Sequence, residues 1–428
     1  MASIGGVPGP ASDSGTNYKD MESNYRGFQN PHVVIKVNKK DMVDKKSELK
    51  ISQVSVDLSS GFEASVASFR IYGVFDRDAG KYLTKKYEKL LHIGSSIEIS
   101  MGYSIGVSPV FVGVITKLNF IYEDPELPYI LLTAMDAKGI MMANNHSKQL
   151  TATTIDAAVK EILDGQAYKN LLTTGIITKI SVEATPDSPG GGTGGAAGGA
   201  GGAAPAAAPT GAAGGSESEK PTIEMVGESD YEFIVRMAKR INYEFFISVG
   251  EVIFRPARVD TDSIMTLSPS NILRSFDFEY DITGQVGTVE VRATDTDKGE
   301  LITSSQKVSN KWSFGKKAEK LVKGHKMVYL DPSVHTKEEA DMRKNFLVDN
   351  ISYKFATLNC ETLGVPELVP GKFIKVAGLG EGPDNKFYLQ EVRHVMSKKG
   401  EYKCIVVGKA KSIEEQQAVP GMGSVPSL

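Results

Sequence analysis

The sharpest pattern of hydrophobic and polar positions in this chain lies in residues 227–255. Apolar residues recur there at the spacing of one helix face, and they are Phe233, Ile234, Met237, Ala238 and Ile241. Ser229 or Asp230 can cap the start of this helix, and Asn242 ends it. Two short alternating runs follow around Gly250. The pattern predicts a capped amphipathic helix that leads into a β-hairpin.

Short strand patterns dominate the segments on either side. Before residue 143 the expected strands are His32–Val37, Leu49–Leu58, Ser65–Val74, Ser96–Gly102, Val110–Ile121 and Tyr129–Met135. From Thr266 onward they are Leu273–Tyr280, Gly287–Asp295, Leu301–Gln306, Phe373–Ala377, Phe387–Met396 and Tyr402–Gly408. One helix, Thr336–Tyr353, starts at a capping box between Thr336 and Glu339. Many strands joined by short turns predict closed barrels or sandwiches.

The middle of the chain combines helix and strand patterns. Thr153–Leu163 has the apolar spacing of a helix, and Leu171–Val182 is expected to be extended. Ser188–Gly215 is almost pure Gly, Ala and Pro, so it cannot bury enough side chain to offset its ordering entropy. We expect a disordered insertion within one α/β unit. An inert insertion is the favoured interpretation and a functional loop is the alternative.

These changes of pattern predict a mainly β chain in which two β-barrel domains flank a small α/β domain. The expected parts are a flexible N-terminal arm (1–30), a first barrel (31–145), an α/β domain (146–262) interrupted by the Gly/Ala-rich loop (188–215), a second barrel (263–411) and a C-terminal tail (412–428).

Two distant segments share one template. Leu91–Ile99 and Leu368–Val376 both follow L-x-x-G-x-x-I-x-[IV], and Gly94 and Gly371 suit tight turns with positive φ. Without a gap the register continues into the next strand, where the matched pairs are Phe111 with Tyr388, Val112 with Leu389 and Ile115 with Val392. The repeat predicts that the two β-domains arose by duplication.

Composition excludes several classes of protein. The net charge is −3 and the pI about 6.2, so no global basic field indicates a nucleic-acid protein. No apolar run approaches the roughly 18 residues of a membrane helix. The N-terminal residues lack the apolar core of a secretory signal. The only cysteines, Cys360 and Cys404, are therefore expected to be reduced and half-buried in strands.

Residues able to do chemistry are scattered. None of the six histidines lies within four residues of another, so no local zinc site is predicted. Asp-x-Asp triplets at Asp76, Asp260 and Asp295 could bind calcium or act as acids, but turns also favour Asp. The Gly378–Gly382 run precedes a strand, which indicates a hairpin turn and not a dinucleotide loop. We predict no catalytic, cofactor-binding or metal-binding residue.

One charge cluster stands out, Lys307–Lys326. Its candidate interface residues are Lys311, Lys316, Lys317, Lys320 and Lys323. A solvated surface, a contact with the acidic face of a protein partner and phosphate contacts with nucleic acid remain open interpretations.

Residues 227–255 resemble a signature segment of the late control D proteins of contractile phage tails, which the VgrG spike proteins of type VI secretion share. The matching residues are Ser229, Asp230, Phe233, Gly250 and Pro256. Leu363–Val376, with Gly371, resembles the family's entry into a late barrel strand, and Thr153–Leu163 resembles the helix after its first barrel. The resemblance covers Pro31–Lys411.

The resemblance implies a non-enzymatic hub in the baseplate of a phage tail, a tailocin or an extracellular contractile injection system. Its barrels would be tail-tube-like, and a homotrimer would adapt the hexameric inner tube to a trimeric spike. Only Ser412–Leu428 follows the last strand, so a separate spike protein is expected. Other baseplate proteins would be further partners, with no membrane, nucleic acid or cofactor. The chain would be made in the cytoplasm and incorporated into the particle.

Two other functions remain open. A hub-associated peptidoglycan hydrolase would bring carboxylates or histidines together in a cleft. A nucleic-acid-binding module would use Lys307–Lys326, and its affinity would fall steeply with salt.

Overall fold

The computed structural model describes residues 18–43, 48–104, 106–186, 223–259, 262–295, 298–308, 316–380 and 383–413. The Gly/Ala-rich loop, most of the expected arm and most of the expected tail lie outside this range. The described residues are mainly β. Among their helices, none is both long and apolar enough to cross a membrane.

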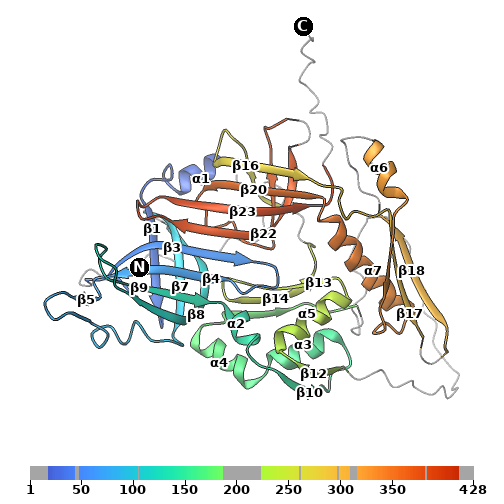
Figure 1. The fold of residues 1–428 in the computed structure, drawn as a ribbon, viewed down its shortest axis with the longest axis horizontal. Coiled ribbons are helices and arrows are strands. Elements are labelled where there is room, and N and C mark those ends of the chain that lie inside the picture. Colours follow the sequence, from blue (N-terminus) through green and yellow to red (C-terminus); the bar gives the residue numbers. More distant parts are fainter. Residues whose placement is uncertain are drawn as a thin grey trace, which may run out of the picture.

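Two sets of six strands have the same order and join in one continuous sheet (Figure 1). The first unit, in sheet order, is β3 (Lys50–Ser59), β4 (Val66–Tyr72), β9 (Tyr129–Met135), β8 (Gly106–Ile121), β7 (Ser96–Tyr103) and β1 (Pro31–Val37). The second unit is β16 (Leu273–Tyr280), β20 (Ala356–Leu363), β23 (Tyr402–Ala410), β22 (Asn385–Met396), β21 (Phe373–Val376) and β15 (Ser263–Leu267). The matching orders support the duplication predicted from sequence. The outermost strand differs in direction, because β1 is antiparallel to β7 whereas β15 is parallel to β21. The first unit also contains three short strands: β2 (Lys40–Asp41), β5 (Phe75–Asp76) and β6 (Lys81–Tyr82).

The strands form where apolar residues alternate, because successive side chains of a strand point to opposite faces. Every second residue of β23 is buried, from Tyr402 to Ala410, and β4 alternates in the same way. The inward residues of both units belong to a single hydrophobic core. The two units therefore fold around a common interior.

The repeat differs from the gapless sequence register by three residues. In the first unit Ser96 lies opposite Val114, whereas in the second unit its counterpart Phe373 lies opposite Tyr388. Tyr388 was matched to Phe111 by sequence, so that part of the alignment is wrong. The second hairpin is shorter, and strand alternation alone does not detect an offset in a connecting turn.

A second core belongs to the α/β elements between the two units. They are α2 (Ala137–Met141), β10 (His146–Gln149), α3 (Ile155–Leu163), α4 (Gln166–Thr174), β11 (Lys179–Val182), β12 (Glu224–Glu228), α5 (Asp230–Arg240), β13 (Tyr243–Ser248) and β14 (Glu251–Pro256). The expectation that Leu171–Val182 is extended is wrong for its first part, which is the end of α4. Gly175, with φ +79°, ends that helix.

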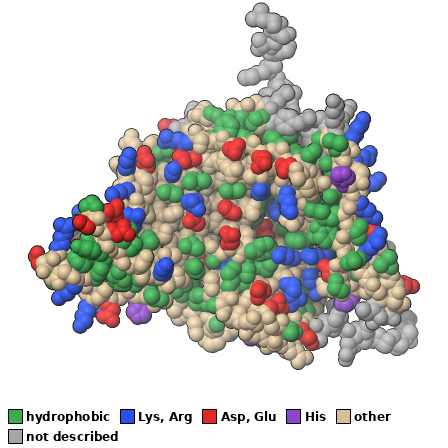
Figure 2. All heavy atoms as spheres, viewed as in Figure 1, with side chains coloured by type: hydrophobic (Ala, Val, Ile, Leu, Met, Phe, Trp, Pro, Cys, Tyr) green, Lys and Arg blue, Asp and Glu red, His purple; other side chains and the backbone are tan. Residues whose placement is uncertain are grey.

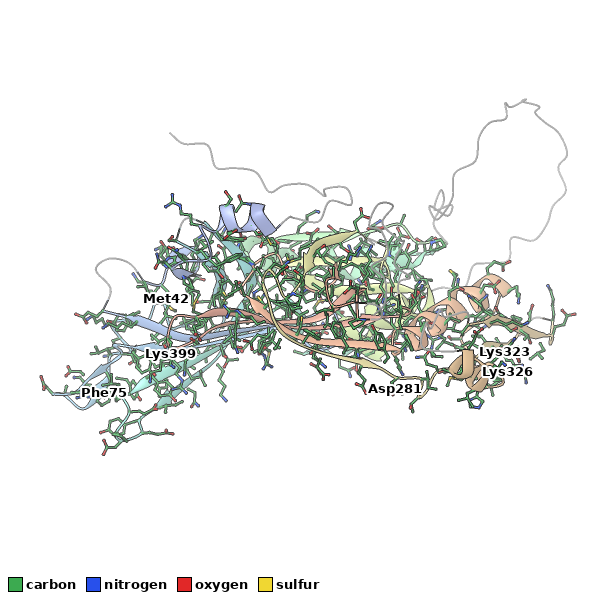
Figure 3. The ribbon with its side chains drawn as sticks, turned by 90° about the horizontal axis from the view of Figure 1, so that it is seen from above. Met42, Phe75, Asp281, Lys323, Lys326 and Lys399 are labelled. Atoms are coloured by element: carbon green, nitrogen blue, oxygen red, sulfur yellow. The ribbon has the colours of Figure 1, made fainter. Side chains whose placement is uncertain are left out.

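A third unit was not foreseen. β17 (Thr288–Thr294), β18 (Leu301–Lys307) and β19 (Lys326–Leu330) form a sheet of their own, with α6 (Lys316–Lys323) and α7 (Lys337–Ser352). This sheet has a separate core with α7. The strand pattern near residues 288–307 predicts membership of the second barrel. That prediction is wrong, because these strands form the separate sheet. Seen from above, Lys323 and Lys326 lie at the opposite end of the molecule from Phe75 (Figure 3).

Part of the expected flexible arm packs against the body of the protein. Residues 18–24 form α1 (Tyr18–Asn24), in which Met21 is buried. Tyr25 is also buried, and its hydroxyl donates a hydrogen bond to Glu367. At the other end of the chain, Ile413 is buried in the same core. The ordered body therefore extends beyond the predicted limits, residues 31 and 411, at both ends.

Candidate functional site

The junction between the two units is a strand pair, β3 with β22. Six residue pairs run antiparallel, from Ser59 opposite Glu391 to Val54 opposite Met396. The amide of Ser60 extends the ladder by donating to the Gln390 carbonyl at 3.0 Å. On the outer face an ion pair joins Arg393 to Asp57 across the junction. We call this strand pair the seam.

The hairpin β13–β14 bridges both units. Gly371, at the start of the second unit's repeat segment, has φ +84°, and a Cβ there would lie 2.5 Å from the ring of Phe246. Arg255 donates to the Gly371 carbonyl at 2.8 Å. At the hairpin tip, Gly250 has φ +76° and a Cβ there would lie 3.0 Å from Val112 of the first unit. Both glycines permit close contacts that a side chain would prevent.

A half-buried polar network reinforces this bridge. Glu244 of β13 pairs with Arg255 at 2.8 Å and accepts a hydrogen bond from the Tyr388 hydroxyl at 2.7 Å. Arg258 stacks on Tyr353, with its guanidinium carbon 4.1 Å from the ring centre. These contacts connect the α/β elements with β22 and α7. The segment that carries the family resemblance therefore occupies the junction of all three cores.

The other resemblance residues serve the local fold. Ser229, and not Asp230, is the N-cap of α5, and it forms a capping box with Glu232. Phe233 is fully buried in the α/β core, and Pro256 ends β14. The helix and hairpin predicted from the hydrophobic pattern are both present.

Asp230 has a role that the sequence did not reveal. Its carboxylate accepts hydrogen bonds from the Tyr168 hydroxyl at 2.5 Å and from the Asn144 amide at 2.6 Å, and it lies 3.0 Å from His146 Nε2. Burial raises the pKa of Tyr168, so this hydroxyl stays protonated and donates. These partners come from distant parts of the chain: Asn144 lies just before β10, His146 begins it, and Tyr168 is on α4. No local spacing could have linked them.

One Cys–His pair has the separation of a nucleophile and its base. Cys404 Sγ lies 3.2 Å from His394 Nδ1. Burial lowers the pKa of His394 to about 4 and raises the pKa of Cys404 to about 12, so both groups are neutral at pH 7. Both side chains are fully buried, and His394 also contacts the Leu368 carbonyl at 2.9 Å. The pair is therefore part of the packed interior. The two cysteines are free, and both are buried where half-burial was expected.

A cavity of about 580 Å³ lies between α5, α7 and β22. Its polar lining includes Lys239, Arg258 and Arg343, and its carboxylate, Glu244, is the partner of Arg255. Within the described part of the chain, no three His, Cys, Asp or Glu side chains are grouped to hold a metal ion. The lining is suited to holding elements together by stacking and ion pairing.

Two of the Asp-x-Asp triplets contain turn-forming aspartates. Asp76 Oδ1 accepts from the amides of Asp78 and Ala79, at 3.1 and 3.0 Å. Asp295 Oδ1 accepts from the amide of Lys298 at 3.1 Å. The turn interpretation is confirmed for these two residues. The triplet at Asp260 falls largely outside the described residues.

The described lysines of this cluster lie on β18, α6 and β19. Lys320 and Lys323 are exposed on α6, whereas Lys326 forms an ion pair with Glu290 at 2.5 Å. The side chains of Lys311, Lys316 and Lys317 lie outside the described residues. Figure 2 shows basic side chains along the margin of the molecule that this unit forms. The interface role of the cluster stays a prediction.

Comparison with known proteins shows the fold. A tail protein from Neisseria meningitidis MC58 superposes with a TM-score of 0.59 at 12% identity, over 89% of this chain and 97% of that one. A 43 kDa tail protein of prophage MuSo2 from Shewanella oneidensis superposes with a TM-score of 0.57 at 10% identity, over 88% and 98%. This chain therefore has the fold of these tail proteins over nearly all of its length.

Sequence comparison adds little. No curated protein sequence matches the chain significantly. A family profile described as the Alg8 N-terminal domain matches residues 215–398, less than half of the chain. That match begins outside the described residues and ends before β23, which pairs with both β20 and β22. It does not correspond to a structural unit.

Proposed function

We propose that this chain is a structural component of a contractile tail or injection-particle baseplate, and that it acts there as the trimeric hub. The observation that carries the proposal is the pair of six-stranded units with one strand order, fused in a single sheet. A trimer of such chains presents six similar β-units, and three copies of each of its other parts. That arrangement suits an adaptor between a hexameric tube and a trimeric spike.

Two further observations support a structural role. The fold matches that of two tail proteins along almost their full lengths. The residues that bear the family resemblance lie in caps, cores and the bridge between units. In this proposal the tube protein, a separate spike protein and other baseplate proteins are the partners, and the chain does no catalysis.

The test is the mass of the purified chain in solution. Light scattering should give the mass of three chains of 46.1 kDa, and a hexameric tail-tube protein should bind that trimer. A strictly monomeric protein at high concentration would contradict the hub, and so would native particles that lack this chain. Zymography on peptidoglycan should show no clearing, since the proposal assigns no hydrolytic site.

A further inference from the structure

The seam has a counterpart that a single chain does not form. Because the two units share one strand order, β16 corresponds to β3 and β8 corresponds to β22. Among the described strands, β16 pairs with β20 alone, and Lys117–Ile121 of β8 pairs with β9 alone. These two edges lie at opposite ends of the sheet, with the seam between them (Figure 1). One chain cannot join them to each other.

Two β-bulges at equivalent positions show which residues of β8 correspond to which residues of β22. The β8–β9 pairing shifts after Ile115, and the β22–β23 pairing shifts after Leu389. Ile115 and Leu389 also exchange hydrogen bonds with the equivalent turns of their units, before β7 and before β21. The residues that follow are therefore equivalent, Lys117 to Glu391 and onward to Tyr122 and Met396.

The correspondence between β16 and β3 follows from the rows of paired residues that cross each unit. Starting at the bulge, these rows are Ile115, Ala134, Ala67 and Val56 in the first unit, and Leu389, Gly408, Leu358 and Phe278 in the second. Phe278 is thus equivalent to Val56. Asp281 is then equivalent to Ser59, and Phe276 to Val54.

Burial differs sharply between the seam and these edges. The core-facing residues of the seam are all buried, namely Val54, Val56, Leu58, Val392, His394 and Met396. Their counterparts at the edges include exposed aromatic rings. Phe120 is 44% exposed, Tyr122 67% and Phe276 45%. Water covers apolar side chains at positions where the seam covers them with a paired strand.

We propose that β8 of one copy of this chain pairs antiparallel with β16 of a second copy, in the register of the seam. Core-facing pairs would be Leu118 with Tyr280, Phe120 with Phe278 and Tyr122 with Phe276. Aromatic cross-strand pairs stabilise a sheet. On the outer face Lys117 would meet Asp281 and Asn119 would meet Glu279. Asn119 and Glu279 would occupy the positions that the ion pair of Arg393 and Asp57 has in the seam.

The outer faces of the two edges are complementary. β16 presents Asp277 and Glu279 outward, both exposed, and Asp281 follows the strand. Lys117 is exposed on β8, where no acidic residue lies between Gly106 and Ile121. Pairing through matching main-chain ladders would also satisfy amides that edge strands leave open to any partner. A second copy fits both the register and the charge.

A short hairpin lies beside this end of β8 but leaves it accessible. Tyr82 of β6 contacts the ring of Phe120 at 5.0 Å between centres, and its hydroxyl donates to the Ile121 carbonyl at 2.8 Å. Phe75 of β5 contacts Tyr122 at 5.6 Å. The exposures of Phe120 and Tyr122 already include the cover from this hairpin. The contact is head-to-tail, because different edges meet, and repeating it either closes a ring or extends a chain of subunits.

Cysteine cross-linking tests the register. The variant Asn119→Cys/Glu279→Cys places thiols at two exposed positions that the pairing brings directly opposite each other. The matched control is Asn119→Cys/Ser275→Cys, whose exposed second site lies four residues along β16, about 13 Å away. Cys360 and Cys404 are buried and give little background. Mild oxidation of the purified full chain, followed by a non-reducing gel, provides the readout.

We expect disulfide-linked multimers from the first variant, at least tenfold more than from the control, with a closed trimer as the limit. The strand pairing rests on the structure, whereas three as the ring size rests on the proposed function. An oligomer by light scattering without selective cross-linking overturns the pairing and leaves the hub intact. Equal cross-linking in both variants also overturns it. Linked species that grow beyond three chains support the pairing and contradict the trimer, and a strict monomer overturns both.

Discussion

At the residue scale, two equivalent glycines carry different constraints. Gly94 and Gly371 both have positive φ, +88° and +84°, as their shared template predicted. Nothing lies within 4 Å of a Cβ added to Gly94, whereas one added to Gly371 meets Phe246. The template explains the backbone conformation of both residues. The contact with the α/β hairpin belongs to Gly371 alone.

Replacing each glycine by alanine should separate these effects. Gly94→Ala places an L-residue in the left-handed region, which should cost about 1–2 kcal/mol of unfolding free energy. Gly371→Ala should lose a further 1–3 kcal/mol or so, because the ring of Phe246 must shift. Urea unfolding of both variants measures the difference. Equal losses would show that the hairpin does not press on Gly371.

His394 should make stability depend on pH. Burial holds its pKa at about 4 in the folded chain, against 6.5 for an unperturbed histidine. Between these values the unfolded chain binds a proton that the folded chain does not, so stability falls as pH falls. The full effect below pH 4 is about 3 kcal/mol.

The variant His394→Gln should therefore be less stable than the wild type at pH 7, with a gap that narrows toward pH 4.5. Thermal unfolding at several pH values measures this gap. His32→Gln, at an exposed position, is the control and should show no narrowing. A constant gap for His394→Gln would mean that this imidazole can gain its proton without unfolding.

At the element scale, local patterns were most reliable where a cap or a hairpin closes within a few residues. α5 and its hairpin lie where apolar spacing predicted them, since the capping box needs only Ser229 and Glu232. α4 was missed because its apolar positions are few, and Tyr168 is its buried residue. The three-residue offset between the repeats was also missed, because one alternating pattern fits several registers.

The cap of α5 offers a direct test. Ser229→Ala removes the hydroxyl that accepts the Glu232 amide at 3.1 Å, and it should cost about 1 kcal/mol of unfolding free energy. Ser229→Thr keeps a hydroxyl at the cap and should lose clearly less. Urea unfolding compares the two. If both variants lose the same amount, packing around the buried Ser229 side chain matters more than the cap.

At the scale of the whole molecule, duplication and insertion determine the architecture. The two units share a core, and the α/β elements and the third unit each have their own. The third unit enters between β16 and β20, whose counterparts β3 and β4 are joined by a short turn. Such an insertion changes neither the strand order nor the seam. It adds surface, including the exposed Lys320 and Lys323.

Deleting residues 188–215 should leave trimer formation intact. Their Gly, Ala and Pro side chains have little surface to bury, and they are far in sequence from the edges proposed to pair. Light scattering of the shortened chain measures the outcome, with the full chain as reference. Loss of the trimer together with a native circular-dichroism spectrum would show that this segment takes part in assembly.

The sequence by itself determined the mainly β class, the capped helix and hairpin, the repeat template and the absence of a local catalytic motif, because these depend on residues within a few positions of one another. Only the tertiary structure decided the seam, the offset of the repeat, the third unit and the environment of Asp230. Those features join residues tens to hundreds of positions apart, and a hydrophobic pattern shows which side chains are buried but not which strand lies beside them.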